Sequence, residues 1–338
     1  MSASSPPVSV GLPVRNGMPY LVESLEALCC QTFADFDVLV CDNASTDGTE
    51  EAVREFARAD DRIKYLRVDT DSGASANFNR CFERTDGSLF TWAASDDRYL
   101  PRYLERCVAH LNANSEHAMC IPSVLFIDED GRVTGSLHQP EDLASPLVAR
   151  RLHAYLDRRS WYMVYGVVRR EALRRTNLFP ARFGPDVTLI WELLLREQIG
   201  TDPEHLLEYR RYRVKRAQSV WQGIQPEGSA PAPRWPHFEL YKDLYSCATD
   251  DELDIEARAA GRRALLRWLV SAPYRDLVVD DLRDELWNEA RRHGTVQDML
   301  LMCAMSILRP TRVARQVGKQ VRARTGRAAA SRDPEKTM

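Results

Sequence analysis

Short apolar runs alternate with helical patterns through the first hundred residues, and this alternation constrains the fold more than any other feature. The runs over 8–14, 36–41, 63–68 and 88–94 have the composition of strands, and amphipathic segments separate them. Strands that alternate with helices in this way build β-α-β units on a parallel sheet. The sequence therefore predicts an α/β, Rossmann-like fold with a mostly parallel central sheet.

The pattern after residue 100 predicts a sheet that becomes mixed. We expect a helix over 101–112, a hairpin turn at 128–131, a strand over 162–168, a helix over 187–198 and a strand within 205–214. A hairpin requires at least one antiparallel pair, so the late strands need not follow the direction of the early ones.

A shift in composition marks a boundary between two parts of the chain. Gly, Ser, Pro and Ala dominate residues 223–236, as in a linker. We therefore predict a catalytic domain at 1–224, a linker at 225–236, a helical extension at 237–323 and a disordered basic tail at 324–338. With 338 residues the chain can build a full core and an appendage.

Composition indicates a cytoplasmic protein. The eight cysteines include no C-x-x-C pair, which favours reduced thiols over a zinc ribbon or a disulfide framework. Residues 1–7 lack the basic and apolar regions of a secretory signal. The apolar run at 299–308 is about half as long as the roughly 20 residues that a bilayer span needs.

The C-terminal segment is strongly cationic, although the whole chain has a formal net charge of only -3. Its basic residues occur without one acid: Arg309, Arg312, Arg315, Lys319, Arg322, Arg324, Arg327 and Arg332. Together with the apolar stretch before it, this segment fits peripheral contact with an anionic inner membrane face. A solvated basic end explains it almost as well. No motif supports binding of nucleic acid.

Acidic and polar residues follow three of the predicted strands. They are Arg15 and Asn16 after the first strand, Asp42 at the end of the second, and the pair Asp96 and Asp97 after the fourth. Ligands of open parallel sheets gather at the carboxyl ends of the strands. Adjacent carboxylates repel each other unless a cation is present, and Mg²⁺ or Mn²⁺ with oxygen ligands suits them. Such an ion usually completes its shell with substrate phosphates, which indicates a nucleotide diphosphate. Capping of the helix expected near Pro101 is the alternative explanation of the acidic pair.

Three motifs occur in order and together resemble a known family. They are Val8-Ser-Val-Gly-Leu-Pro-Val-Arg-Asn16, Cys41-Asp-Asn-Ala-Ser-Thr-Asp-Gly-Thr49 and Phe90-Thr-Trp-Ala-Ala-Ser-Asp-Asp97. The chain resembles a family 2 glycosyltransferase over about residues 8–221. The resemblance implies an A-type glycosyltransferase fold and a nucleotide-sugar donor, of which a UDP- or dTDP-sugar is the first expectation. It also implies a hydroxyl acceptor: a glycan, a lipid-linked group or a small metabolite.

The resemblance assigns roles to the residues of these motifs. Asp42 would bind the base of the donor, Asp96 the ribose, and Asp97, with Asp96 beside it, the divalent ion. Pro13 and Arg15 would flank the nucleoside. The segment 73–79, with Asn77, would line the donor pocket, although Asn77 or Asn79 as a plain helix cap explains the same pattern.

Inverting transfer also needs a general base, and Asp186 is the expected one. The family places this acid just before a helix, as in Phe183-Gly-Pro-Asp186 here. A helix N-cap is the structural alternative for Asp186. Glu192, further into the same helix, is the other acid, and a structural role suits it better.

One residue departs from the family pattern. Where the family often has a histidine that ligates metal, this chain has Lys215, with Arg213 and Arg216 close by. A protonated lysine cannot bind metal, but it can stabilise a diphosphate directly. We therefore expect a donor site that depends less on metal. An exposed basic loop is the alternative.

Two other functions compete with glycosyl transfer. A catalytically impaired sugar-nucleotide-binding or scaffold protein is conceivable because of Lys215. A nucleotidyltransferase is the weaker rival, because it usually needs a Gly-rich phosphate loop that Gly11-Leu-Pro-Val-Arg15 does not provide.

Overall fold

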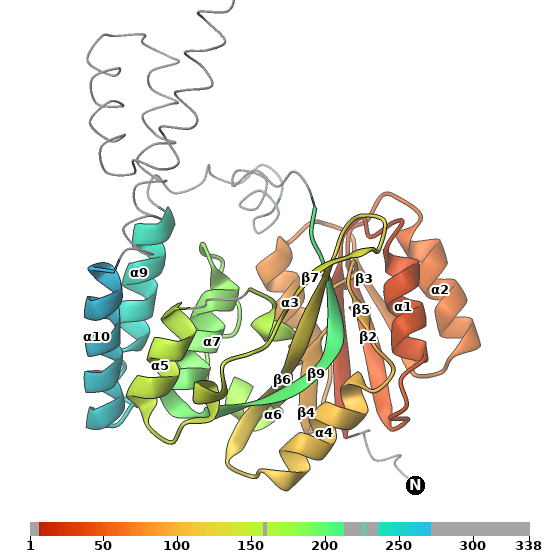
Figure 1. Ribbon diagram of the computed structural model, residues 1–338. Coiled ribbons are helices and arrows are strands. Elements are labelled where there is room, and N and C mark those ends of the chain that lie inside the picture. Colours follow the sequence, from red (N-terminus) through yellow and green to blue (C-terminus); the bar gives the residue numbers. More distant parts are fainter. Residues whose placement is uncertain (1–6, 158–160, 213–225, 227–235, 272–338) are drawn as a thin grey trace, which may run out of the picture. The chain divides into compact units, whose positions relative to one another are not determined.

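The computed structural model describes residues 7–157, 161–212, 226 and 236–271, which belong to a compact unit that covers Met1–Ser271 (Figure 1). The strands are β1 (Val8–Val14), β2 (Phe36–Asn43), β3 (Ile63–Val68), β4 (Leu89–Trp92), β5 (Arg98–Tyr99), β6 (His117–Ile127), β7 (Val133–Leu137), β8 (Val167–Arg169) and β9 (Gln198–Arg210). The α-helices are α1 (Leu21–Cys29), α2 (Thr49–Ala59), α3 (Ala74–Glu83), α4 (Tyr103–Ala113), α5 (Val148–Asp157), α6 (Arg170–Leu173), α7 (Pro185–Arg196), α9 (Pro236–Cys247) and α10 (Ile255–Leu269). Two 3-10 turns complete the set, η1 (Glu141–Ala144) and η2 (Trp161–Tyr165).

The strands form one mixed sheet in the order β3-β2-β1-β4-β8-β6-β9-β5, with β7 paired to β6. Strands β1 to β4 are parallel, and β6 is parallel to β9. The antiparallel pairs are β4 with β8, β8 with β6, β6 with β7, and β5 with β9. The expected α/β fold with a mostly parallel sheet that becomes mixed late is therefore confirmed.

The centre of the sheet is buried on both faces. Every residue of β1 and β2 is buried, which is typical of parallel strands covered by helices on each side. Helix α3 packs so closely on β1 that a Cβ atom on Gly11 would lie 2.5 Å from the Cβ of Cys81. This tight layer fixes where the carboxyl ends of β1 and β2 lie.

Three expectations about the later elements were wrong in part. Of the strand expected over 162–168, the first residues form η2, and only β8 is extended. The strand expected within 205–214 begins earlier, at Gln198. The helix expected from Pro101 begins at Tyr103, because residues 101 and 102 form a turn.

Helices α5, α7, α9 and α10 pack together on the side of the sheet away from α1 and α2 (Figure 1). Helices α7 and α9 run in the same direction, since Gly184 lies against Leu240 and the Trp191 indole donates to the carbonyl of Leu244 at 2.9 Å. Helix α10 lies within the helical extension expected over 237–323, and α9 begins at Pro236, just before it. The predicted linker lies almost wholly outside the described residues, so the domain division stays a prediction. No helix among the described residues is long and apolar enough to cross a bilayer.

Candidate active site at the carboxyl edge of the sheet

The register of the parallel strands brings the predicted residues to one edge of the sheet. Val14 at the end of β1 pairs with Asp42 near the end of β2, and Gly11 pairs with Trp92 at the end of β4. The turn that contains Asp96 and Asp97 follows β4 directly. The end of β9 reaches the same edge, because the Arg210 amide donates to Asp97 Oδ1 at 2.7 Å.

The Asp96–Asp97 turn is held from the end of β9. Asp97 is only 1% exposed, and the Arg210 backbone fixes one of its carboxylate oxygens. Asp96 Oδ2 accepts a hydrogen bond from the Tyr212 hydroxyl at 2.8 Å. Helix α4 has Arg102 as its N-cap and no side-chain cap bond, so the capping explanation of the acidic pair is wrong.

Asp186 lies in the first turn of α7. Gly184 is the N-cap, in a left-handed conformation at φ 67° that glycine adopts readily, and Pro185 begins the helix. Asp186 is therefore not the N-cap, and the structural alternative for it is wrong. Burial raises the pKa of Asp186 from 3.8 to about 6, while the backbone N–H groups of Val187 and Asp186 act in the opposite direction. A carboxyl group with this pKa is ionised at neutral pH and still accepts a proton readily.

The pKa values of two tyrosines are raised by Asp186 and also by the acidic pair Asp96 and Asp97. The pKa of Tyr209 is raised first by burial and then by the charges of Asp97, Asp96 and Asp186, in that order. The pKa of Tyr165 is raised by burial and then by charges that include the same three carboxylates. Because all three acids contribute to raising the pKa of both tyrosines, the β4–β5 turn and the start of α7 lie within electrostatic range of the same two hydroxyl groups.

Asp42 lies deeper in the same edge. It is fully buried, and its Oδ2 accepts hydrogen bonds from the Tyr65 hydroxyl at 2.6 Å and from Arg67 Nη1 at 2.8 Å. Its Oδ1 accepts from the Ser45 amide at 2.8 Å. Both oxygens thus have partners within the protein. Arg67, whose side chain is 29% exposed, is the more accessible member of this ion pair.

Pro13 and Arg15 differ in exposure. Pro13 lies within buried β1, in register with Cys41 of β2. Arg15 projects beyond the strand, 40% exposed, with its Nε 3.6 Å from Asp71 Oδ2. Arg15 is therefore the more accessible of the two for a ligand at this edge.

Asn77 joins α3 to the ends of the central strands. Its Nδ2 donates to the carbonyl of Cys41 at 2.8 Å, and its Oδ1 accepts from Arg80 Nη1 at 2.6 Å. Asn79 exchanges two hydrogen bonds with the backbone of Phe179, each of 3.0 Å. Both residues lie inside α3, whose N-cap is Gly73, so neither is the helix cap that the sequence left open.

Glu192 has a structural environment. It is 2% exposed, and its carboxylate accepts hydrogen bonds from the backbone N–H of Asn177 at 2.8 Å and from the Cys247 thiol at 3.3 Å. These contacts tie α7 to the preceding loop and to α9. Lys215, Arg213 and Arg216 lie outside the described residues, so their contact with a diphosphate stays a prediction.

Sequence reasoning missed Arg210, Tyr165 and Tyr209 as residues of this edge. Arg210 ends a strand of mixed polarity and precedes further basic residues, so the linear pattern does not distinguish it from them. Nothing in the linear pattern marks the two tyrosines, because only the folded sheet brings them beside the three acids.

The side chains at this edge provide only some of the ligands that a hard divalent ion needs. Asp96 and Asp97 offer carboxylate oxygens, the ligands that Mg²⁺ and Mn²⁺ prefer. Among the described residues no group of three His, Cys, Asp or Glu side chains is placed to hold a metal. An ion held here would therefore complete its shell with water and phosphate oxygens from a ligand.

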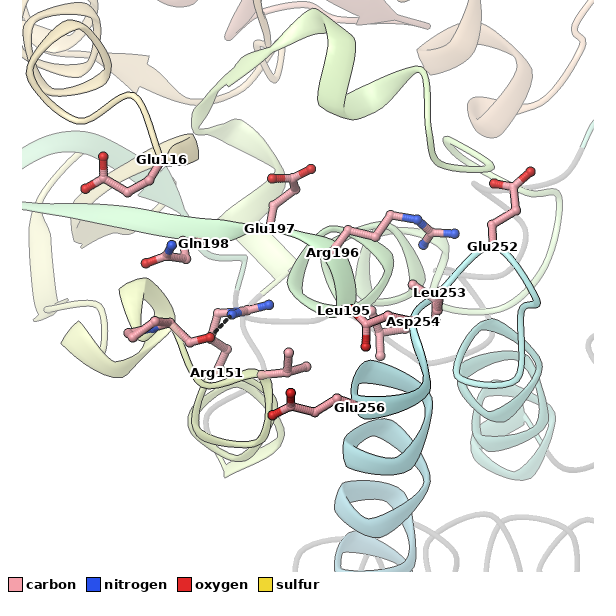
Figure 2. Close-up of a pocket in the computed structure, with 12 residues that line it drawn as sticks. Glu116, Arg151, Leu195, Arg196, Glu197, Gln198, Glu252, Leu253, Asp254 and Glu256 are labelled. Atoms are coloured by element: carbon pink, nitrogen blue, oxygen red, sulfur yellow. Dashed lines mark hydrogen bonds between the residues drawn. The ribbon is translucent and has the colours of Figure 1, made fainter.

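A hollow of about 400 Å³ lies elsewhere, near the amino ends of β6 and β9 (Figure 2). Two of the charged side chains around it have partners within the protein. Arg151 donates to the carbonyls of Ser145 and Pro146, and Asp254 caps α10. This hollow lies at the opposite edge of the sheet from the acids and contributes no residue to the candidate site.

Comparison with known proteins identifies the family of this chain. The model of glycosyl transferase family 2 matches residues 9–179. A Bacillus subtilis protein named as glycosyltransferase EpsE is 32% identical over 146 residues, which cover 42% of this chain and 52% of that protein. Glycosyltransferase AglE of Haloferax volcanii is 33% identical over 114 residues, 33% of this chain and 38% of AglE. The matched part thus spans about half or less of these relatives.

Solved structures show the same A-type glycosyltransferase fold. Residues 1–349 of S. aureus TarS, solved with UDP-GlcNAc, match with a TM-score of 0.57 and 17% identity, over 82% of this chain and 80% of that one. The mannosyltransferase PcManGT from Pyrobaculum calidifontis, solved with GDP-Man and Mn²⁺, matches with a TM-score of 0.55 and 18% identity, over 93% of this chain and 83% of that one.

Proposed function

Because this chain belongs to glycosyl transferase family 2, we propose that it moves a sugar from a nucleotide diphosphate to an acceptor hydroxyl with inversion at the anomeric carbon. One observation carries the proposal: the strand register brings Asp42 and the Asp96–Asp97 turn to one carboxyl edge of the sheet, where the Arg210 amide at the end of β9 donates to Asp97. The donor is a UDP- or dTDP-sugar. A relative of similar fold was solved with UDP-GlcNAc, which supports a uridine nucleotide first.

Asp186 is the general base in this mechanism. It takes the proton of the acceptor hydroxyl as that oxygen forms a bond to the anomeric carbon. The bond from that carbon to the diphosphate oxygen breaks on the opposite face, and the electron pair leaves with the nucleotide. Inversion follows because attack and departure occur on opposite sides. The raised pKa of Asp186 supports this role, since a base with a pKa of about 6 transfers protons efficiently at neutral pH.

Asp97, with Asp96 beside it, would hold Mn²⁺ or Mg²⁺. When bound, such an ion neutralises charge that develops on the departing diphosphate. Lys215, with Arg213 and Arg216, is proposed to stabilise the same charge, which would weaken the dependence on metal. Asp42, Pro13, Arg15 and Asn77 belong to the nucleoside end of the donor site. There Asp42 and Arg67 would meet the base as one charged pair.

A panel of nucleoside diphosphates in thermal unfolding tests the proposal. UDP or dTDP at about a hundredfold excess over Kd is expected to raise the Tm by about 5 °C, since only the folded chain binds. Mn²⁺ should increase the shift, and Asp97→Ala should abolish the increase. Stabilisation by no uridine or thymidine nucleotide, with or without Mn²⁺, would contradict the donor assignment. Binding of UDP-sugar without slow hydrolysis would instead favour an impaired binding protein.

A further inference from the structure

Arg210 makes more connections at the acidic edge than the other residues there. Its side chain is 1% exposed, yet each nitrogen of the guanidinium has an acceptor. Nε donates to the carbonyl of Asp96 at 2.8 Å, and Nη2 donates to Glu23 Oε2 at 2.8 Å. Nη1 donates to the carbonyls of Asp128 and Glu129, at 3.1 and 3.2 Å. The planar fork of arginine suits such divergent contacts, and a lysine ammonium cannot reproduce them.

These contacts join three segments that are far apart in the sequence. The Asp96–Asp97 turn follows β4, the carbonyls of 128 and 129 belong to the β6–β7 turn, and Glu23 lies on α1. Arg210 itself ends β9, and its amide fixes Asp97. One residue therefore sets the position of the acidic pair twice, through its backbone at Asp97 and through its side chain at Asp96.

Aromatic rings surround this connection. The Arg210 guanidinium lies 4.2 Å from the centre of the Tyr20 ring, a cation–π distance. Tyr20 also contacts Tyr212 edge to face at 6.0 Å, and the Tyr212 hydroxyl holds the Asp96 carboxylate. The rings and the backbone carbonyls leave the guanidinium little freedom, so the geometry of the turn depends on it.

We propose that Arg210 is a positioning residue, which holds the Asp96–Asp97 turn in the geometry that binds a divalent ion with the donor diphosphate. This inference rests on the proposed function. Arg210 touches neither substrate nor metal in this role, because it is a buried cation that acts through the two acids. Outer partners of metal ligands typically contribute about 10- to 100-fold to metal affinity.

The test compares Arg210→Lys with Arg170→Lys. Arg170 is a matched control: it is buried, donates to the carbonyls of Gly87 and Phe82, and lies 4.6 Å from the ring centre of Phe82. Arg170 lies near the amino end of β4, at the edge of the sheet opposite the acids. Both variants should lose thermal stability to a similar degree. Mn²⁺ binding, measured by electron paramagnetic resonance with and without UDP, should weaken about tenfold or more only in Arg210→Lys.

Activity at increasing Mn²⁺ gives a second measurement. Arg210→Lys should need about tenfold more Mn²⁺ for half-maximal rate and should approach the wild-type kcat at saturation, as lost positioning predicts. Tyr212→Phe, which removes a single hydroxyl, should also raise the Mn²⁺ concentration needed for half-maximal rate, but by a smaller factor. This variant keeps the inference testable if Arg210→Lys does not fold.

Two results would overturn the inference in different ways. Equal Mn²⁺ affinity in wild type, Arg210→Lys and Tyr212→Phe would show that the Arg210 contacts are only structural. A wild-type chain that binds UDP but no Mn²⁺ would remove the metal role of Asp97, and the role of Arg210 with it, while leaving Asp186 as the base. A chain that binds neither UDP nor Mn²⁺ would contradict the proposed function itself.

Discussion

Two properties of Asp186 support its proposed role as the general base. Its charge contributes to raising the pKa of the same tyrosine as the charges of Asp96 and Asp97, and burial raises the pKa of its own carboxyl group from 3.8 to about 6. The carboxylate of Glu192, one and a half turns further along α7, accepts hydrogen bonds from Asn177 and Cys247. These surroundings favour Asp186 over Glu192 as the proposed base.

The pH dependence of turnover follows from the raised pKa of Asp186. A base must be deprotonated to act, so kcat/KM should fall tenfold per pH unit below about pH 6. Asp186→Asn should lower kcat by about 10²- to 10⁴-fold and remove this acidic limb from the residual rate. Rates measured from pH 5 to 8 at saturating donor test both effects. An Asn variant with full turnover would assign the base elsewhere.

The same substitution separates catalysis from stability. The folded state holds the Asp186 proton more tightly than the unfolded chain, so this group's contribution to stability falls as pH rises from about 3.8 to about 6. A neutral Asn avoids the cost of burying the charge. Asp186→Asn should therefore have a Tm at pH 7.5 equal to or above that of wild type. A lower Tm would indicate that the carboxylate has a structural role.

At the scale of elements, the early strands were predictable and two later ones were not. Strands β1 and β3 occupy the expected residues, because most residues of each are apolar and polar segments flank them. The run at 162–168 is equally apolar, and periodicity alone cannot distinguish a strand from the 3-10 turn that forms there. The strand predicted within 205–214 also left out the start of β9, which includes Gly200 and Pro203, residues that are uncommon inside strands.

Long-range packing explains that last difference. A Cβ atom on Gly200 would lie 2.0 Å from His110 Nε2, so glycine lets β9 pass close to α4. Pro203 lies where the pairing of β9 with β6 shifts register, between Pro122 and Ser123. The candidate acids could be predicted because they directly follow strands or begin a helix. Arg210 could not, since its partners come from three distant segments.

Gly11, in the first motif, gives a test of the layer that positions the site. A methyl group there would lie 2.5 Å from Cys81 Cβ and 2.9 Å from Phe90 Cζ, so α3 or β4 must shift. Gly11→Ala should lower the free energy of unfolding by about 1–3 kcal/mol, measured in urea. Gly135→Ala is the control, because its nearest contact would be an ordinary 3.6 Å and its effect should stay within about 0.5 kcal/mol. Equal effects would contradict the tight packing of α3 on β1.

At the scale of the described unit, helices beyond the predicted linker complete the core that carries Asp186. Leu240 and Leu244 of α9 are fully buried, and Gly261 of α10 lies close to Leu195 of α7. Arg182 and Asp243 add an ion pair at 2.6 Å between the loop before α7 and α9. The sequence placed a boundary near residue 224 from composition alone, which reports where a linker is and not what packs after it.

Fragments of the chain test how far the catalytic unit extends. A fragment of residues 1–271 should unfold in one transition and keep the UDP-induced rise in Tm. A fragment of residues 1–224 lacks α9 and α10, which leaves the indole N–H of Trp191 without its carbonyl acceptor and exposes the apolar face of α7. Such a face costs about 25 cal/mol for each Å² returned to water, so the shorter fragment should melt many degrees lower or aggregate.

Because α7 begins at Pro185, loosening of this helix should weaken turnover more than UDP binding, which depends on β1, β2 and the Asp96–Asp97 turn. Equal Tm and equal turnover in both fragments would establish residues 1–224 as a self-sufficient domain and α9 and α10 as an appendage.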